Sequence, residues 1–168
     1  MITEPDWKGH ESNPHGRVYI GKHTIIREGV IINKPTGKCT HIGDDCYIMN
    51  RAFIGHDCHI DDGVQINPGA SIAGFVKIGK YSHIGMNASI HQDSELGEYC
   101  VLGANGFFKG KSPDGIVWAG VPSRPIKVNM IGIERSNLSE LERIELIERA
   151  IRFINGFKRS SDIEGITD

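Results

Sequence analysis

Aliphatic residues recur at every sixth position over most of the chain, and this pattern dominates the sequence. Between residues 42 and 102 the recurring positions are Ile42, Ile48, Ile54, Ile60, Ile66, Ile72, Ile78, Ile84, Ile90, Leu96 and Leu102. The same period occurs earlier at Ile20, Ile26 and Ile32, and the longer step from Ile32 to Ile42 marks an insertion. We therefore expect a loop in NKPTGKCT, residues 33–40.

A hexapeptide period predicts an all-β solenoid with three short strands in each coil, whose recurring aliphatic side chains fill the interior. Small or β-branched residues lie two positions before the aliphatic ones, and they include Cys46, Cys58 and Cys100. Free cysteine packs as a small hydrophobe, and the sequence has no CxxC pair. We therefore expect these three cysteines to point inward.

The period fails after Leu102, although Phe108 is still in phase. We expect a loop in KGKSPDG (109–115) and a last short strand in IVWAGV (116–121), and we expect the two prolines of PSRP (122–125) to end the ladder.

Helical spacing begins at Ser139, where Ser139 and Glu142 form a predicted capping box. The predicted helix would cover the solenoid core, with a tail that frays after Lys158. Its expected inner face consists of Leu141, Ile144, Ile147, Ile151 and Ile154.

Composition limits the classes of function. The 168 residues carry a formal net charge of −2, which argues against a general nucleic-acid binder. The N-terminus lacks the features of a signal peptide, and no apolar run approaches the roughly 18 residues of a membrane span, so we expect a cytoplasmic protein. A basic cluster of Lys109, Lys111, Arg124 and Lys127 would suit an anionic partner.

Stacking of the coils brings candidate catalytic residues together. Residues 18 apart lie about 4.8 Å apart along the axis, so His56 shares a column with Gly74 and Gln92, and His91 lies in the next column. An imidazole beside the Asp57 carboxylate can take a proton from a hydroxyl or amine, and a glycine leaves its N–H accessible to an oxyanion. The grouping therefore suits acyl transfer.

Two other interpretations compete for these residues. His56 could simply be a polar residue on a solenoid face. The HDCH run at 56–59 also has metal-ligand residue types, and His41 shares a column with His59. However, Lys77 follows in that column and Cys58 is at an inward position, so we expect no metal site.

The same residues resemble the UDP-N-acetylglucosamine acyltransferase family of lipid A biosynthesis. The resemblance rests on PDWK (5–8), IGHDC (54–58), IAGFV (72–76), SIHQD (89–93) and VNMIGIERSNLS (128–139). It implies a left-handed parallel β-helix of hexapeptide repeats with a short C-terminal α-helical extension. It also implies a homotrimer with its sites between subunits.

The resemblance assigns roles to single residues. It makes His56 the general base, Asp57 its partner and Gly74 the donor of the oxyanion N–H. The residues implied to contact the acceptor sugar or its phosphates are Asp6, Lys8, His91 and Gln92. Asn129 and Arg135 would lie near the nucleotide or the donor's phosphopantetheine.

Several positions depart from the family pattern. Phe53, Phe75 and Pro122 replace histidines of the acceptor pocket, and Ile131 and Ser136 replace an acidic residue and an arginine. Met86 and Ala104 stand where glycine is common along the acyl channel. Because added bulk shortens the chain that fits, we expect a short or branched acyl group.

A second resemblance concerns the donor. AGVPSRP (119–125), with Gly120 and Arg124, is similar to a segment of hexapeptide acetyltransferases that depend on CoA. The expected donor is therefore a thioester of acyl carrier protein or of CoA, with no tightly bound cofactor.

The sequence thus predicts an acyltransferase that acts on a UDP-amino sugar such as UDP-N-acetylglucosamine. Its predicted parts are a substrate loop (1–17), the β-helix (18–128) and a helical extension with a tail (129–168). The alternatives are a CoA-dependent N-acetyltransferase of an amino-sugar nucleotide and a non-catalytic trimeric solenoid that binds a sugar nucleotide.

Overall fold

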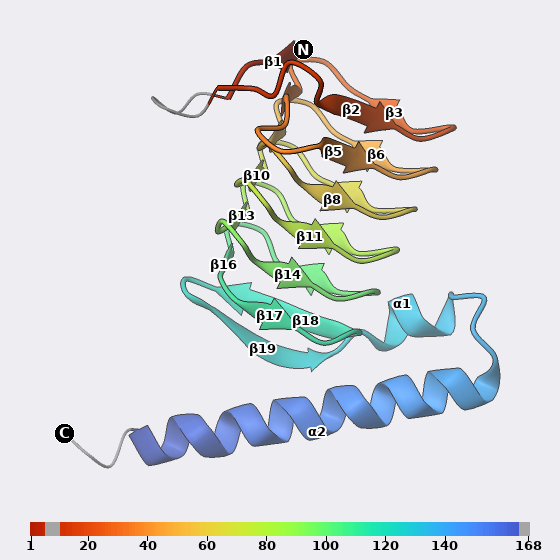
Figure 1. Ribbon diagram of the computed structural model, residues 1–168. Coiled ribbons are helices and arrows are strands. Elements are labelled where there is room, and N and C mark those ends of the chain that lie inside the picture. Colours follow the sequence, from red (N-terminus) through yellow and green to blue (C-terminus); the bar gives the residue numbers. More distant parts are fainter. Residues whose placement is uncertain (6–10, 165–168) are drawn as a thin grey trace.

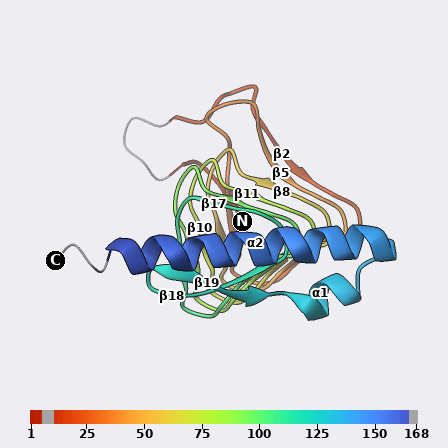
Figure 2. The same cartoon turned by 90° about the horizontal axis from the view of Figure 1, so that it is seen from below.

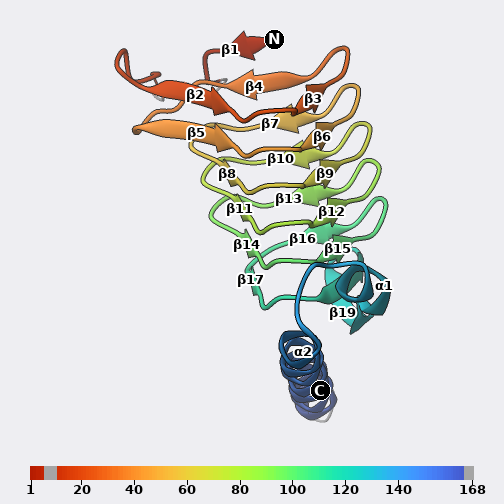
Figure 3. The same ribbon diagram turned by 90° about the vertical axis from the view of Figure 1, so that its right-hand side faces the viewer.

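The computed structural model describes residues 1–5 and 11–164, in which the chain winds into a stack of short strands with a long helix across its C-terminal end (Figure 1). Seen along the stack, the coils enclose a common interior, and the helix crosses it (Figure 2). Three sheets, which we call faces A, B and C, form the sides of the solenoid (Figure 3).

The strands of each face follow one another down the stack. Face A contains β1 (Ile2–Thr3), β4 (Ile31–Asn33), β7 (Phe53–Ile54), β10 (Ser71–Ile72), β13 (Ser89–Ile90) and β16 (Phe107–Phe108). Face B contains β2 (Arg17–Ile20), β5 (Cys39–Ile42), β8 (His59–Ile60), β11 (Lys77–Ile78), β14 (Glu95–Leu96) and β17 (Lys111–Ser112). Face C contains β3 (Ile25–Ile26), β6 (Tyr47–Ile48), β9 (Gln65–Ile66), β12 (His83–Ile84), β15 (Val101–Leu102), β18 (Ile116–Gly120) and β19 (Ser123–Val128).

The aliphatic ladder forms the core, as its period predicts. Parallel pairing joins residues 18 apart, for example Ile54 with Ile72, and every ladder residue from Ile42 to Leu102 is at most 2% exposed. Each such side chain contributes roughly 1.5 to 3 kcal/mol through burial. Ile20 is in phase but 42% exposed, because β2 is the edge strand of face B.

The inward position of three cysteines is also confirmed. Cys46, Cys58 and Cys100 are buried and free. Burial raises the pKa of the Cys58 thiol to about 12, so it stays protonated at neutral pH and packs as a small apolar group.

The corners between faces are tight turns that hold one residue in the left-handed region. At the corner between faces A and B these residues are Asp57, Phe75 and Asp93, with φ of 57°, 59° and 60°. Asp tolerates this conformation, whereas a bulky residue adopts it rarely and at an energetic cost. Phe75 is therefore a strained residue at the corner that carries His56.

Two expectations for the end of the solenoid are wrong. Within the expected loop 109–115, β17 continues face B by pairing with β14. The PSRP segment does not end the sheet, because β19 turns back and pairs antiparallel with β18. Pro125 lies opposite Trp118 in this pair, and a residue without an N–H is tolerated there because β19 is the edge strand of face C.

Two helices follow the hairpin. α1 (Met130–Glu134) lies within the predicted helical extension 129–168, ahead of Ser139, where helical spacing begins in the sequence, and α2 spans Glu140–Glu164. The capping box is confirmed: Ser139 donates from its N–H and its hydroxyl to the Glu142 carboxylate, and the Glu142 N–H donates to Ser139 Oγ. α2 continues to Glu164, so it extends past Lys158, where the sequence analysis expects the tail to begin.

The expected inner face of α2 is wrong for most of its members. Up to residue 158 the buried residues of α2 are Leu146, Ala150 and Ile154, while three expected ones, Leu141, Ile144 and Ile151, are exposed. Trp118 explains the rotation, because the rings of Phe153 and Phe157 pack against it with centroids 6.0 and 6.2 Å away. Two expected members do face inward: Ile154 is buried, and Ile147 is partly buried against the cluster that contains Leu146.

Candidate active site

The corner between faces A and B brings together five of the predicted site residues. His56 and Asp57 connect β7 to β8, Gly74 lies one coil further along, and His91 and Gln92 lie beyond it. Backbone hydrogen bonds between successive coils set this order, since Phe75 N–H donates to the carbonyl of His56 and Asp93 N–H donates to the carbonyl of Gly74. We call this corner the His56 corner.

His56 and Asp57 form a buried hydrogen-bonded pair. His56 Nδ1 lies 2.9 Å from Asp57 Oδ2, and both side chains are 8% exposed. An ionised carboxylate only accepts hydrogen bonds, so Nδ1 carries the proton and Nε2 is the basic nitrogen of the neutral ring. The pair therefore has the arrangement of an oriented general base.

The Asp57 carboxylate is held in its ionised form by hydrogen bonds. Burial by itself would raise its pKa, but hydrogen bonds from His56, from Thr36 and from the N–H of Gly37 together lower that pKa below its ordinary value. The donors in the inserted loop are the N–H and hydroxyl of Thr36 and the N–H of Gly37, each at 2.8 Å.

Gly74 lies directly against the histidine ring. A Cβ at this position would be 2.7 Å from both Cε1 and Nε2 of His56, so only glycine leaves room for the ring. Within residues 1–5 and 11–164 the buried Gly74 N–H donates no hydrogen bond. It is therefore placed to donate to an oxyanion formed next to the base.

A shallow groove of about 620 Å³ runs over face A from the exposed residues His91 and Gln92. It is lined by Phe53, Ser71, Ser89 and Phe107 among others. The sequence analysis did not predict this groove. Its signal was a column of outward residues at 18-residue spacing on β7, β10, β13 and β16, in which aromatic side chains at the two ends flank two serines.

The four predicted donor residues lie around a different corner, between faces C and A. Met86 and Ala104 are exposed there, on turns that are joined by the hydrogen bond from Asn105 N–H to the Met86 carbonyl. Gly120 and Arg124 lie on the β18–β19 hairpin, and the Arg124 guanidinium sits 5.5 Å from the centre of the Phe157 ring.

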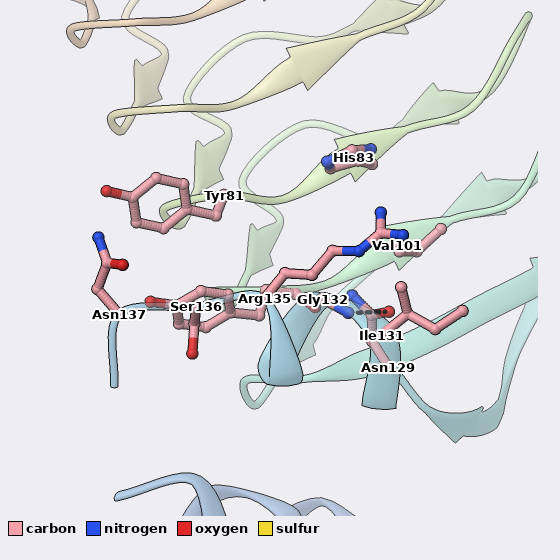
Figure 4. Close-up of a pocket in the computed structure, with 10 residues that line it drawn as sticks. Tyr81, His83, Val101, Asn129, Ile131, Gly132, Arg135, Ser136 and Asn137 are labelled. Atoms are coloured by element: carbon pink, nitrogen blue, oxygen red, sulfur yellow. Dashed lines mark hydrogen bonds between the residues drawn. The ribbon is translucent and has the colours of Figure 1, made fainter. Parts of the chain in front are cut away.

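Asn129 and Arg135 line a third region, a pocket of about 380 Å³ between α1 and face C (Figure 4). Arg135 extends from the end of α1 toward Val101 and His83. The Asn129 amide is engaged within the protein, because Nδ2 donates to the Tyr99 carbonyl at 2.8 Å and Oδ1 accepts from Gly132 N–H at 3.2 Å. Asn129 therefore caps the start of α1 and ties it to Tyr99, another residue that lines the pocket.

Sequence reasoning missed the other walls of this pocket. The Tyr81 and Tyr99 rings stack with centroids 5.5 Å apart, and burial lowers the pKa of the neighbouring His83. The 18-residue spacing of the two tyrosines was the available signal. The pocket and the His56 corner lie on different sides of one chain, so the structure does not bring the two groups together.

Two predicted residues, Asp6 and Lys8, lie outside the described residues. Among residues 1–5 and 11–164, no three His, Cys, Asp or Glu side chains are grouped so that they could hold a metal ion. In the same part of the chain, no helix has the length and apolar character needed to cross a bilayer.

Comparisons with known proteins identify relatives of this fold. The family model described as bacterial transferase hexapeptide (six repeats) matches residues 39–74. The acyl-(acyl-carrier-protein)-UDP-N-acetylglucosamine O-acyltransferase of Campylobacter concisus is 36% identical over 141 residues, which is 82% of this chain and 53% of that protein. The chain thus spans about half the length of the curated relatives it matches.

Solved structures give the same result. The UDP-N-acetylglucosamine acyltransferase from Campylobacter jejuni is 28% identical, with a TM-score of 0.77 over 87% of this chain and 57% of that one. The UDP-N-acetylglucosamine O-acyltransferase from Moraxella catarrhalis superposes with a TM-score of 0.81 at 24% identity, over 88% of this chain and 58% of that one. These relatives are left-handed β-helices, and a coil of the opposite hand would not superpose on them, so the left-handed winding is confirmed. By its repeat, its fold and these relatives, the chain belongs to the hexapeptide-repeat family of the UDP-N-acetylglucosamine acyltransferases.

Proposed function

We propose that the protein is an acyltransferase that moves a short acyl group from a thioester to a hydroxyl of a UDP-linked amino sugar. The observation that carries the proposal is the buried His56–Asp57 pair, whose basic nitrogen faces Gly74, a glycine whose N–H donates no hydrogen bond among the described residues. A polar residue that served only the solenoid surface would not need a buried carboxylate with three further donors.

The reaction follows from this geometry. His56 Nε2 takes the proton of the acceptor hydroxyl while the hydroxyl oxygen forms a bond to the thioester carbonyl carbon. The carbonyl oxygen becomes an oxyanion, which the Gly74 N–H stabilises. Collapse of the intermediate breaks the carbon–sulfur bond, and the leaving thiolate takes the proton from the imidazolium. Asp57 stays ionised throughout and stabilises the imidazolium.

The acceptor is proposed to bind beside this pair through His91 and Gln92, together with Asp6 and Lys8. The groove over face A starts at His91 and Gln92, so it is the proposed place for the acyl chain. Met86 and Ala104 do not line this groove but are exposed at the opposite corner of face A, where they are proposed to limit the length of the acyl chain. We expect chains of a few carbons to be transferred; efficient transfer of a chain of about 14 carbons would contradict it.

The assembly is proposed to be a homotrimer whose sites lie between subunits. In one chain the His56 corner and the pocket of Asn129 and Arg135 face different directions, so neither forms a complete site. A threefold assembly would set the pocket of one subunit against the His56 corner of the next, because cyclic symmetry joins two different surfaces of neighbouring copies.

The donor is proposed to approach over the C-terminal coils. Lys109, Lys111, Arg124 and Lys127 are exposed there, and Lys111 forms a surface ion pair with Glu95 at 3.1 Å. This charge suits an acidic carrier protein or the phosphates of CoA. Both donors are cytosolic, so the proposal includes a cytoplasmic location. CoA would favour the alternative N-acetyltransferase, for which the hairpin of Gly120 and Arg124 is the supporting feature.

The first test is an assay of product formation by mass spectrometry. Nucleotide sugars with a free hydroxyl or a free amine are incubated with acyl-CoA and acyl carrier protein thioesters of several lengths. An acylated product that disappears in His56→Ala would support the proposal and identify donor and acceptor. Binding of nucleotide sugars without any product would favour the non-catalytic solenoid.

The second test addresses the shared site. His56→Ala and Arg135→Ala are each expected to be inactive as pure proteins. Co-expression would form mixed trimers in which some interfaces combine an intact His56 corner with an intact Arg135 pocket. Recovery of activity would support sites between subunits, whereas mixed trimers as inactive as either parent would contradict them.

A further inference from the structure

The inserted loop at residues 34–38 contacts the catalytic pair directly. It belongs to the coil that precedes His56, and within the described residues it supplies three of the four hydrogen bonds to the Asp57 carboxylate. Thr36 donates twice to Oδ2, from its N–H and from its hydroxyl, and Gly37 N–H donates to Oδ1. Oδ2 also faces His56 Nδ1. The orientation of the carboxylate therefore depends on this loop.

The approach of the loop to the carboxylate is close. A Cβ at Gly37 would be 2.8 Å from Asp57 Oδ1, so a side chain at this position would push the carboxylate or the loop away. A loop that merely connected β4 to β5 would not need both a glycine against the carboxylate and a hydroxyl directed at it. These two independent features indicate that the loop is shaped around Asp57.

Buried polar residues hold the base of the loop. Asn33 and Thr40 flank it and are 2% and 0% exposed. Thr40 Oγ1 donates to the Asn33 carbonyl at 3.1 Å and accepts from Asp57 N–H at 2.9 Å. Thr40 thus closes the loop and at the same time fixes the backbone of Asp57, which lies in the left-handed region.

The outer side of the loop is tied to the N-terminal part of the chain. Asn13 N–H donates to the Pro35 carbonyl at 2.9 Å, and Asn13 Nδ2 donates to the Gly37 carbonyl at 2.8 Å. On the other side, Lys34 N–H donates to the Thr3 carbonyl at 2.8 Å. Two carbonyls and one N–H of the loop are therefore held from outside, whereas the N–H groups of Thr36 and Gly37 are directed at Asp57.

We propose that the loop of residues 34–38 positions the general base, and that Thr36 is a positioning residue which acts on His56 through Asp57. The inference rests on the proposed role of His56. Without the Thr36 hydroxyl, Oδ2 loses one of its donors and the carboxylate is no longer held in line with His56 Nδ1. Gly37 complements Thr36, because only a residue without a side chain allows this contact.

The test compares Thr36→Val, which keeps the shape but removes the donor, with Thr36→Ser, which keeps the donor. Because small displacements of a reacting group cost up to about 100-fold in rate, we expect Thr36→Val to lower kcat by about 10- to 100-fold with little change in KM. Thr36→Ser should restore most of kcat. Gly37→Ala should behave like Thr36→Val.

A second readout does not depend on activity. In protein with ¹⁵N-labelled histidine, the NMR signal of the His56 Nδ1 proton reports its hydrogen bond to Asp57. We expect this signal in the native protein and in Thr36→Ser, and its loss through exchange with water in Thr36→Val, as in Asp57→Asn.

Thr24→Val is the matched control. The Thr24 hydroxyl, like that of Thr36, donates a hydrogen bond within the fold. Its acceptor is the carbonyl of Gly43, it also accepts from Cys46 N–H, and it lies at another corner. We expect this variant to lose stability without losing kcat or the His56 signal. If Thr36→Val keeps native kcat and the native signal while His56→Ala is inactive, the role of the loop is wrong and the proposed function stands. If His56→Ala is active, the proposed function fails. The NMR signal alone then tests whether the loop holds the Asp57 carboxylate against His56.

Discussion

The ring of Phe75 meets the ring of His56 edge-on, with centroids 5.0 Å apart and an angle of 89° between the ring planes. Phe75 holds this place from a left-handed backbone position, where a bulky residue is strained. The same left-handed position recurs in the corner turns of other coils, for example at Tyr81 and Tyr99, so the turn itself enforces it. Phe75 therefore forms an apolar wall for the proposed base at some cost in stability.

Phe75→Asn tests this wall. Asparagine adopts the left-handed conformation readily, so the variant relieves strain while it removes the ring contact with His56. We expect a thermal midpoint equal to or above that of the native protein together with a lower kcat. His23→Asn, at an exposed left-handed position of the first coil, is the control and should leave kcat unchanged. A less stable Phe75→Asn protein with native kcat would refute the idea.

Gly74→Ala addresses the space beside the base. The added methyl would lie 2.7 Å from Cε1 and Nε2 of His56, and the ring must move to admit it. We expect kcat to fall by about 100-fold or more while the circular dichroism spectrum stays native. Steady-state kinetics with the donor and acceptor found by mass spectrometry would measure this. Native kinetics in Gly74→Ala would show that the ring position does not matter for turnover.

Ile66→Ala tests the aliphatic ladder. Ile66 is fully buried in the middle of the solenoid, so its truncation leaves a cavity and should lower the free energy of unfolding by about 2 to 5 kcal/mol. The matched variant Ile20→Ala, at a ladder position that is 42% exposed, should cost about 1 kcal/mol or less. Denaturant titration of both proteins gives the comparison. Equal losses would mean that the ladder is not the core.

Asp57→Asn tests the electrostatics of the buried carboxylate. Its pKa is lower in the folded protein than in the unfolded chain, so ionisation stabilises the fold at neutral pH. This contribution is present above the unfolded pKa of about 3.9 and is lost as pH falls through the folded pKa. We expect the stability difference between native protein and Asp57→Asn to be largest near neutral pH and to shrink below about pH 4.

Glu98→Gln tests a carboxyl whose pKa is shifted in the opposite direction, upward, by folding. Burial and the nearby Asp114 raise the pKa of Glu98, so its ionisation opposes folding at neutral pH. This variant should be more stable than the native protein near pH 7, with the gain vanishing below about pH 4. Urea titrations at several pH values test both variants, and a pH-independent difference for Asp57→Asn would contradict the buried, ionised pair.

The columns of the solenoid were predictable because the fold is a repeat. Once the period is known, residues 18 apart must stack, so the sequence alone places His56 over Gly74 and Gln92. The inward cysteines and the capping box of α2 are likewise local consequences of spacing. The contact between His56 and Asp57 was predictable as well, because the two residues are adjacent in the sequence at one corner.

Features that break the repeat could not be read in this way. The inner face of α2 depends on how Phe153 and Phe157 pack on Trp118, and apolar residues on more than one side of the helix left that choice open. The return of the chain at β19 depends on pairing with β18 at an edge, where Pro125 is tolerated.

The sequence by itself therefore determined the coil, its core and the members of the His56 corner, because each follows from a translation of 18 residues along one axis. Only the tertiary structure decided that Thr36 and Gly37 hold Asp57, and that Arg135 lies on another side of the chain from His56. These relationships join segments outside the repeat, and their geometry arises from packing rather than from period.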